Sequence, residues 1–428
     1  MAGTLAGKVV VTGAWRSVAT FLPDKILGVG RRRTFGCTVD HIDSISSSLD
    51  EGAHPNYDAA ERQLDLFNRL CPLLIVRLLP LRVFDDLNSY AFYDELPTKL
   101  ATHDDECLGT QSTECVAGLL INRALSNSEF EDVRRLAAEL CGRIHPKVLI
   151  PIMSYQLKNA SNSKDLLKIK ACLFSTCTSL LVRGTDAYAH PDVLQIRKAI
   201  ETVLLWPSVD GDDISKAQHG CIDCLALMLC TELQATKAVK NSTSRDSVAK
   251  GSVCSYVIHH LVCDEDTIIS LKLDRDEVPK AHISFRLCMA NVLISACQKV
   301  PRASKKPFVS KILPRILHSI KEIADSEVRS ACIQVFFSMV YHLKSLVLPY
   351  SSDLLKASIK SLREGSEKER IAGAKLLASL MASEEAVLQN ISGGLLEARA
   401  LLQDICSSEP SLDVWKMCQR LLVCLTSV

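Results

Sequence analysis

Aromatic residues are scarce in this chain: Phe, Trp and Tyr make up 5% of its 428 residues, although apolar residues of all kinds make up 47%. Stacked helices pack small and branched aliphatic side chains and need few large rings, so this ratio suits a helical repeat. Net charge is also nearly absent, at +1. A near-neutral chain is not expected to coat nucleic acid through bulk charge, although a local basic patch still can bind it.

Long apolar runs are missing as well. The longest candidate, Cys71 to Phe84, is interrupted by two prolines and two arginines: Pro72, Arg77, Pro80 and Arg82. A helix that crosses a bilayer needs about eighteen or more mainly apolar residues. We therefore expect no membrane insertion.

Catalytic motifs are lacking too, since the sequence contains no glycine-rich phosphate loop, no HExxH and no GxSxG. Gly7 to Ala14 (GKVVVTGA) resembles the first strand and turn of a short-chain dehydrogenase, but Ser17 and Ala19 stand where that turn requires glycine. Stacked helix pairs, the architecture that the repeat described below predicts, also rarely enclose a dry reaction pocket. We expect a protein that is not an enzyme, with no cofactor and no catalytic residues.

Cysteine, by contrast, is abundant, with 18 residues. Most occur singly in apolar helical patterns, where a small buried hydrophobe fits, and not in the short loop-rich frameworks of secreted proteins. This usage indicates a reducing compartment and predicts a cytoplasmic or nuclear location, or both.

The closest approach to a metal site is the segment around Cys221, together with His219, Cys224 and Cys230. These residues lie within one apolar helical pattern, whereas structural zinc sites usually take their ligands from turns. We interpret the cysteines as buried structural residues and predict no metal. A zinc site, or a metal-dependent enzyme built on it, is the alternative.

Residues 1–55 differ from the rest of the chain. They contain glycine and arginine clusters, few acids and little helical periodicity. We predict an irregular or disordered leader. The alternatives are an organellar targeting sequence, a nuclear signal at Arg31 to Arg33, and a non-native start to part of a longer protein.

The segment Pro307 to Ser383 repeats its own pattern. A shift of 42 residues aligns Pro307, Ile312, Leu313, Leu317 and Ile320 with Pro349, Leu354, Leu355, Ile359 and Leu362. A shift of 41 aligns Ala331, Ile333 and Val335 with Ala372, Ala374 and Leu376, and, one period upstream, with Ala290, Val292 and Ile294. A period in the forties with two amphipathic helices per unit is typical of a stacked-helix solenoid.

Weaker forms of this pattern extend over residues 56–428, with loops expected near 86–109, 237–250 and 264–280. Glu131 to Leu157 is a second clear unit, and Tyr57 begins the first helix, with Leu64 and Phe67 on one face. The last helix, Ser411 to Leu425, carries an apolar stripe that docks on its own repeat or meets a partner. The predicted fold is all-α: a right-handed α-solenoid of stacked antiparallel helix pairs.

The segments SEVRSACIQVFF and EDVRRLAAELC resemble the second helix of HEAT repeats, and the chain is similar to the HEAT/armadillo superfamily. The resemblance implies an inward valine, an arginine that reaches an acid on the neighbouring unit, and an alanine that allows close helix approach. These positions are Val328, Arg329 and Ala331 in one segment, and Val133, Arg134 and Ala137 in the other.

The third copy departs from this pattern, because Glu369 replaces the valine while Arg370 keeps the positive charge. Proteins of this superfamily generally act as scaffolds whose helical surface holds an extended partner. The resemblance therefore implies a non-enzymatic scaffold or adaptor that binds protein.

One basic segment offers a candidate contact surface. Between Lys299 and Lys311 the chain has five cations and no acid: Lys299, Arg302, Lys305, Lys306 and Lys311. Such a segment binds phosphate groups or an acidic peptide, or is simply a solvated loop between repeats. A nucleic-acid-associated or nuclear-transport adaptor that uses this segment is the alternative to a scaffold for protein alone.

Overall fold

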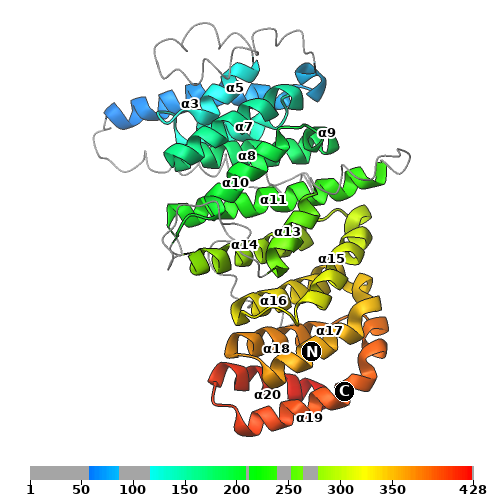
Figure 1. Cartoon of the computed structure of the whole chain (residues 1–428). Helices are drawn as coiled ribbons and strands as arrows, with labels where there is room; N and C mark the ends of the chain where they lie inside the picture. The colour runs from blue at the N-terminus through cyan, green and yellow to red at the C-terminus, as the bar shows by residue number, and fades with distance from the viewer. Residues whose placement is uncertain (1–56, 86–115, 209–211, 239–251, 264–277, 427–428) are drawn as a thin grey trace. The chain divides into compact units, whose positions relative to one another are not determined.

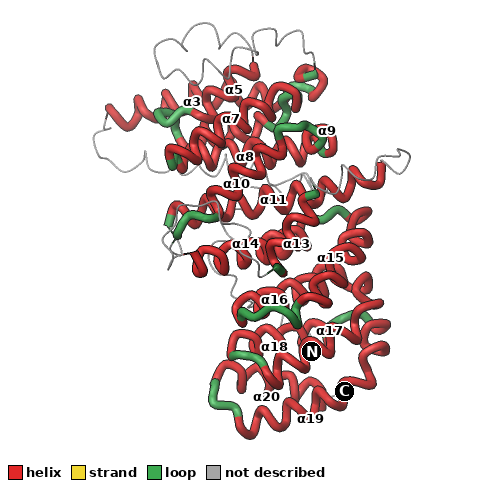
Figure 2. The backbone as a smooth tube through the Cα atoms, viewed as in Figure 1, coloured by secondary structure: helices red, strands yellow, loops and turns green. Residues whose placement is uncertain are grey.

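The computed structural model describes residues 57–85, 116–208, 212–238, 252–263 and 278–426. All regular secondary structure in these ranges is helical (Figure 2), which confirms the all-α prediction. The predicted leader (1–55) and the predicted loop at 86–109 lie outside the described residues. So do most of the other two predicted loops, although α11 continues through Ala238 and α14 already begins at Val278.

Backbone contacts divide the chain into two compact units, whereas the sequence analysis treated residues 56–428 as one domain. Unit 1 comprises Met1–Ala199 with Ser208–Gly220, and unit 2 comprises Ile200–Pro207 with Cys221–Val428. The helices of unit 1 are α3 (Tyr57–Leu78), η1 (Leu81–Phe84), α5 (Val116–Leu125), α6 (Glu131–Cys141), α7 (Pro146–Ser163), α8 (Leu166–Arg183) and α9 (Thr185–Tyr188). Helices α10 (Val193–Leu204) and α11 (Asp213–Ala238) have residues in both units. In unit 1, α6 packs against α3, α5 and α8, and α7 packs against α8.

Unit 2 contains two rows of helices. Its elements are α13 (Val253–Val262), α14 (Val278–Lys299), η6 (Arg302–Ser304), α15 (Lys305–Ser319), α16 (Ser326–Leu343), η7 (Lys344–Tyr350), α17 (Ser351–Glu364), α18 (Glu367–Met381), α19 (Glu385–Ser408) and α20 (Leu412–Thr426). In the even row, α14, α16, α18 and α20 contact one another in succession, and in the odd row α13, α15, α17 and α19 do the same (Figure 1). Each odd helix also contacts the even helix that follows it.

Side-chain caps fix where two of the even-row helices, α16 and α18, begin. The Asp325 carboxylate accepts hydrogen bonds from the backbone amides of Glu327 and Val328, at 2.8 and 2.9 Å, at the start of α16. At the start of α18, the Ser366 hydroxyl and the Glu369 carboxylate cap each other's backbone amides in a capping box. Such caps satisfy amides that have no partner within the helix.

The core of unit 2 lies between its rows. Phe308, Phe336, Ile312 and Leu376 are fully buried there. At the C-terminal end, α20 packs on α18 and α19, and Val414 and Leu421 of its predicted apolar stripe are buried.

Two predicted buried faces are wrong in detail. Ala331, expected at a close helix approach, is only half-buried, and the small residue at the α16–α18 contact is Ser330, whose hydroxyl donates to the Lys368 carbonyl at 3.2 Å. The surface of α16 is apolar or small nearly all round, so its sequence did not distinguish these neighbours. On α3, Leu64 and Phe67 are 60% and 57% exposed.

One apolar stretch is longer than the longest apolar run expected from the sequence. Ser326–Glu364 is helical throughout and is long and apolar enough to cross a membrane, by length and composition. Half of its most apolar window is buried inside the protein, where α16 contacts α14 and α18. A core helix of this kind passes the same test, so the expected absence of membrane insertion stays a prediction.

Candidate functional site

An ion pair joins α16 to α18 in the even row. Arg329 Nε lies 2.7 Å from Glu369 Oε1, and the Arg329 guanidinium also donates to the carbonyl of Ile323 at 2.9 Å. The Glu369 side chain is only 7% exposed and accepts a hydrogen bond from the Ser366 amide at 2.8 Å. Burial opposes ionisation of this carboxyl, but the hydrogen bonds from Arg329 and Ser366 outweigh it, so the pKa of Glu369 lies below its ordinary value.

A similar pair joins α18 to the end of α19. Arg370 Nη2 lies 3.1 Å from Glu409 Oε1, and the Glu409 side chain is 4% exposed. Arg134 of α6 has no ion pair within the described residues. The buried acid of unit 1 is instead Glu129, which Arg69 and Arg123 both contact. Arg329 and Arg370 therefore each form an ion pair with a buried carboxylate of the same protein.

The remaining predicted repeat positions are mostly internal. The buried ones are Val133, Ala137, Ala290, Val328, Val335, Ala372 and Leu376. The half-buried ones are Arg134, Ile294, Arg329, Ala331 and Arg370.

The five cations of the predicted basic segment, residues 299–311, do not share one exposed surface. Lys299 pairs with Asp223 and donates to the Ser295 hydroxyl at 2.5 Å, in a largely buried cluster. Lys305 donates to the His342 carbonyl at 3.0 Å and so caps the end of α16. Only the other three cations of the segment, Arg302, Lys306 and Lys311, are exposed.

The cysteine cluster lies in the interior of α11. Cys221 and Cys224 are fully buried, and the Cys230 thiol donates to the Ala296 carbonyl across a distance of 3.8 Å. Burial raises the pKa of Cys230 to about 12, so its thiol stays protonated. His219 Nδ1 lies 2.6 Å from the Ser215 carbonyl. Among the described residues, no three His, Cys, Asp or Glu side chains converge as metal ligands.

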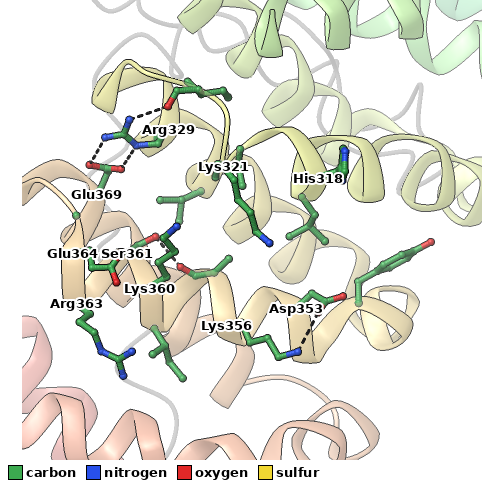
Figure 3. A pocket seen from close by; sticks show the side chains of 18 of the residues that line it. His318, Lys321, Arg329, Asp353, Lys356, Lys360, Ser361, Arg363, Glu364 and Glu369 are labelled. Carbon is green, nitrogen blue, oxygen red and sulfur yellow. Dashed lines mark hydrogen bonds and ion pairs between the residues drawn. The ribbon is translucent and has the colours of Figure 1, made fainter.

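A pocket of about 1030 Å³ opens between α15 and α17 of the odd row, with α16 behind it (Figure 3). Pro314, Leu317 and Ile320 line it from the α15 side, Ala357 and Ile359 from α17. Its apolar floor is completed by Ile323 and Ile333. Ligand pockets typically occupy about 300–1,000 Å³, so this space is large enough to hold several side chains.

A short 3-10 turn lies beside the pocket. This turn, η7 (Lys344–Tyr350), follows α16 and contains Pro349. It packs against α15, α16, α17 and α19. Pro314 stands inside α15 and removes one backbone hydrogen-bond donor from that helix. Next to this turn α15 and α17 touch at few points, whereas α16 and α18 pack closely.

The charges around the pocket are partly neutralised from within. Three lining cations pair with lining acids: Arg329 with Glu369, Lys356 with Asp353 at 3.6 Å, and Arg363 with Glu397 at 2.7 Å. Lys321 and Lys360 also line the pocket, and neither has an ion-pair partner within 4.0 Å among the described residues. In Figure 3, Arg329 and Glu369 lie at one end and Asp353 and Lys356 at the other, with Lys321 and Lys360 in between.

Sequence reasoning missed this site, although the repeat contains a signal for it. The 42-residue shift that aligns the first helices also aligns His318 with Lys360, and Lys321 with Arg363. All four line the pocket. A search for basic residues at matching repeat positions, in place of a continuous basic segment, finds them.

No protein-family model matches the chain, and no curated protein matches it. The candidate site is therefore defined by its own geometry. It is an open, apolar-floored pocket with two unneutralised cations, which is suited to binding.

Proposed function

We propose that this chain is a HEAT/armadillo-type α-solenoid that acts as a non-enzymatic scaffold or adaptor and binds protein through its helical surface. The observation that carries the proposal is the two-row packing of unit 2, in which each helix contacts the helix two places along the chain. An extended array of this kind presents a long ridged surface, and that surface is what such proteins use for binding.

Contacts between residues about forty positions apart support the repeat in both units. They are hydrogen bonds to backbone carbonyls and ion pairs: Thr178 with Ala138, Arg183 with Arg143, Arg329 with Glu369, Ser330 with Lys368, and Arg370 with Glu409. A spacing of about forty residues is the spacing of one helix pair. The right-handed form of the solenoid is part of the proposal.

The chemistry of the cysteines favours a reducing location, in cytoplasm or nucleus. Most of the fifteen cysteines that the structure describes are buried in helix contacts. Desolvation raises the pKa of Cys141 and of Cys332 to about 12, as expected of inert packing residues. Such thiols serve as small hydrophobes.

Affinity capture of the tagged full chain from its own cells, followed by mass spectrometry, tests the function. We expect a small set of proteins recovered in near-stoichiometric amounts, still retained after nuclease treatment. Loss of all partners on nuclease treatment, together with a steep fall of nucleic-acid affinity with salt, would support the nucleic-acid adaptor instead. Recovery of no protein at all would overturn the scaffold proposal.

A further inference from the structure

The pocket between α15 and α17 has walls of unlike character. On the α15 side Leu317 and Ile320 are half-buried, so part of each side chain faces the pocket. The buried Ile333 of α16 lies behind them. These groups form an apolar floor. An aliphatic side chain that packs on this floor removes apolar surface from water, which stabilises the bound state.

The rim of the pocket carries positive charge on both sides. Lys321 extends from the end of α15 toward α17, and Lys360 comes from α17 itself (Figure 3). Each of the other lining cations has a carboxylate partner in the protein, and of the lining acids only Glu364 has no ion-pair partner among the described residues. The charge that remains available is therefore positive on balance, and it flanks the apolar floor.

We propose that this groove binds an acidic peptide segment of a protein partner. One aliphatic side chain of the segment packs on Leu317 and Ile320, and its flanking carboxylates meet Lys321 and Lys360. The proposal rests on the proposed scaffold function and names the chemistry of one partner. Charge complementarity selects the segment, and the apolar floor fixes its position, because exposed charge pairs alone contribute little affinity.

The test uses the full chain and a fluorescein-labelled peptide, Glu-Asp-Glu-Leu-Asp-Glu-Asp, followed by fluorescence anisotropy. We expect saturable binding that weakens as salt is added. Replacing the peptide leucine with serine, or all its acids with lysine, should abolish most of the signal. Replacing Lys321 and Lys360 together with glutamate should lower the affinity about tenfold or more, since two favourable charge contacts become repulsive.

The matched control replaces Lys306 and Lys311 with glutamate. Both are exposed on α15 but do not line the pocket, and the change in net charge is the same. This control should keep wild-type affinity to within about twofold. Circular dichroism melting of both double variants should match the wild type, which shows that the groove variant is folded.

Any one of four results would overturn the proposal. The wild-type chain does not bind the peptide, both double variants lose affinity equally, or inositol hexakisphosphate binds at the groove while the peptide does not. Affinity capture with the K321E/K360E variant separates this proposal from the scaffold function. If that variant recovers every wild-type partner, the scaffold function stands and the groove proposal fails.

Discussion

The two rows of helices in unit 2 differ in how closely two of their neighbouring helices pack. In the even row, α16 and α18 pack closely, and the seam is closed by the Arg329–Glu369 pair and the Ser330–Lys368 hydrogen bond. In the odd row, α15 and α17 touch at few points and leave a pocket with two unneutralised lysines. We therefore expect α16 and α18 to contribute more to stability than α15 and α17, and the binding proposed above falls to the pocket between α15 and α17.

The largest expected effect comes from placing a charge in the even-row seam. Ser330→Arg should destabilise unit 2 by about 3–5 kcal/mol, because a long charged side chain has no room or partner at the α16–α18 contact. Ala331→Arg, at the half-buried neighbouring position, should cost about 1 kcal/mol or less. Urea unfolding followed by circular dichroism measures both, and equal losses would show that the buried face of α16 has been misplaced.

The next largest effect should come from removing the cation of the Arg329–Glu369 ion pair. Arg329→Ala leaves the Glu369 carboxylate, which is almost fully buried, without its cation and should cost about 2–3 kcal/mol. The odd-row control is Lys356→Ala, which removes an exposed pair with Asp353 and should cost about 0.5 kcal/mol or less. Comparable losses in the two variants would remove the distinction between the rows.

Lowering the pH should reduce the stability that the Arg329–Glu369 pair contributes between α16 and α18. Replacing the Glu369 carboxylate should remove this pH dependence. The pKa of Glu369 is lower in the folded protein than in the unfolded chain, where it is about 4.3. Its contribution to stability is therefore complete above the unfolded-state pKa and is lost as pH falls through the folded-state pKa. Glu369→Gln should be less stable than wild type at neutral pH, and the gap should close in acid. A gap that is independent of pH would contradict this assignment.

The smallest effect concerns the turn that leads from α16 to the odd row. Lys344 adopts φ 52° and ψ −126° there, nearly the same backbone conformation as Gly184 at the end of α8. Only glycine adopts this conformation without strain. Lys344→Gly should therefore stabilise the protein by about 1 kcal/mol, and Gly184→Ala should destabilise it by about 1–2 kcal/mol. Thermal melting distinguishes the opposite signs, and a loss of stability in Lys344→Gly would contradict the account.

The helical class and several boundaries could be predicted from sequence, because they depend on local signals. The segment EDVRRLAAELC forms α6, from Glu131 to Cys141, at the start of the unit predicted from Glu131 to Leu157. The replacement of valine by Glu369 looked like a fault in the repeat. In the fold, this acid is the partner of Arg329, which lies 40 residues earlier.

What could not be predicted depends on three-dimensional register. Whether Ser330 or Ala331 faces α18 is decided by about 100° of helix rotation, and α16 is apolar or small on most sides. The basic segment 299–311 appeared continuous in sequence, but the fold uses Lys299 and Lys305 as internal donors. The two lysines of the pocket that have no ion-pair partner among the described residues, Lys321 and Lys360, lie 39 residues apart in the sequence, so no local window contains both.

Hydrogen–deuterium exchange of the full chain tests the difference between the rows most directly. Backbone amides exchange according to how readily each helix opens locally, and helices with more buried contacts open less often. We expect slower exchange in α16 and α18 than in α15 and α17 under the same conditions. Equal exchange in the two helix pairs, or slower exchange in α15 and α17, would contradict the expected difference in local stability between the rows.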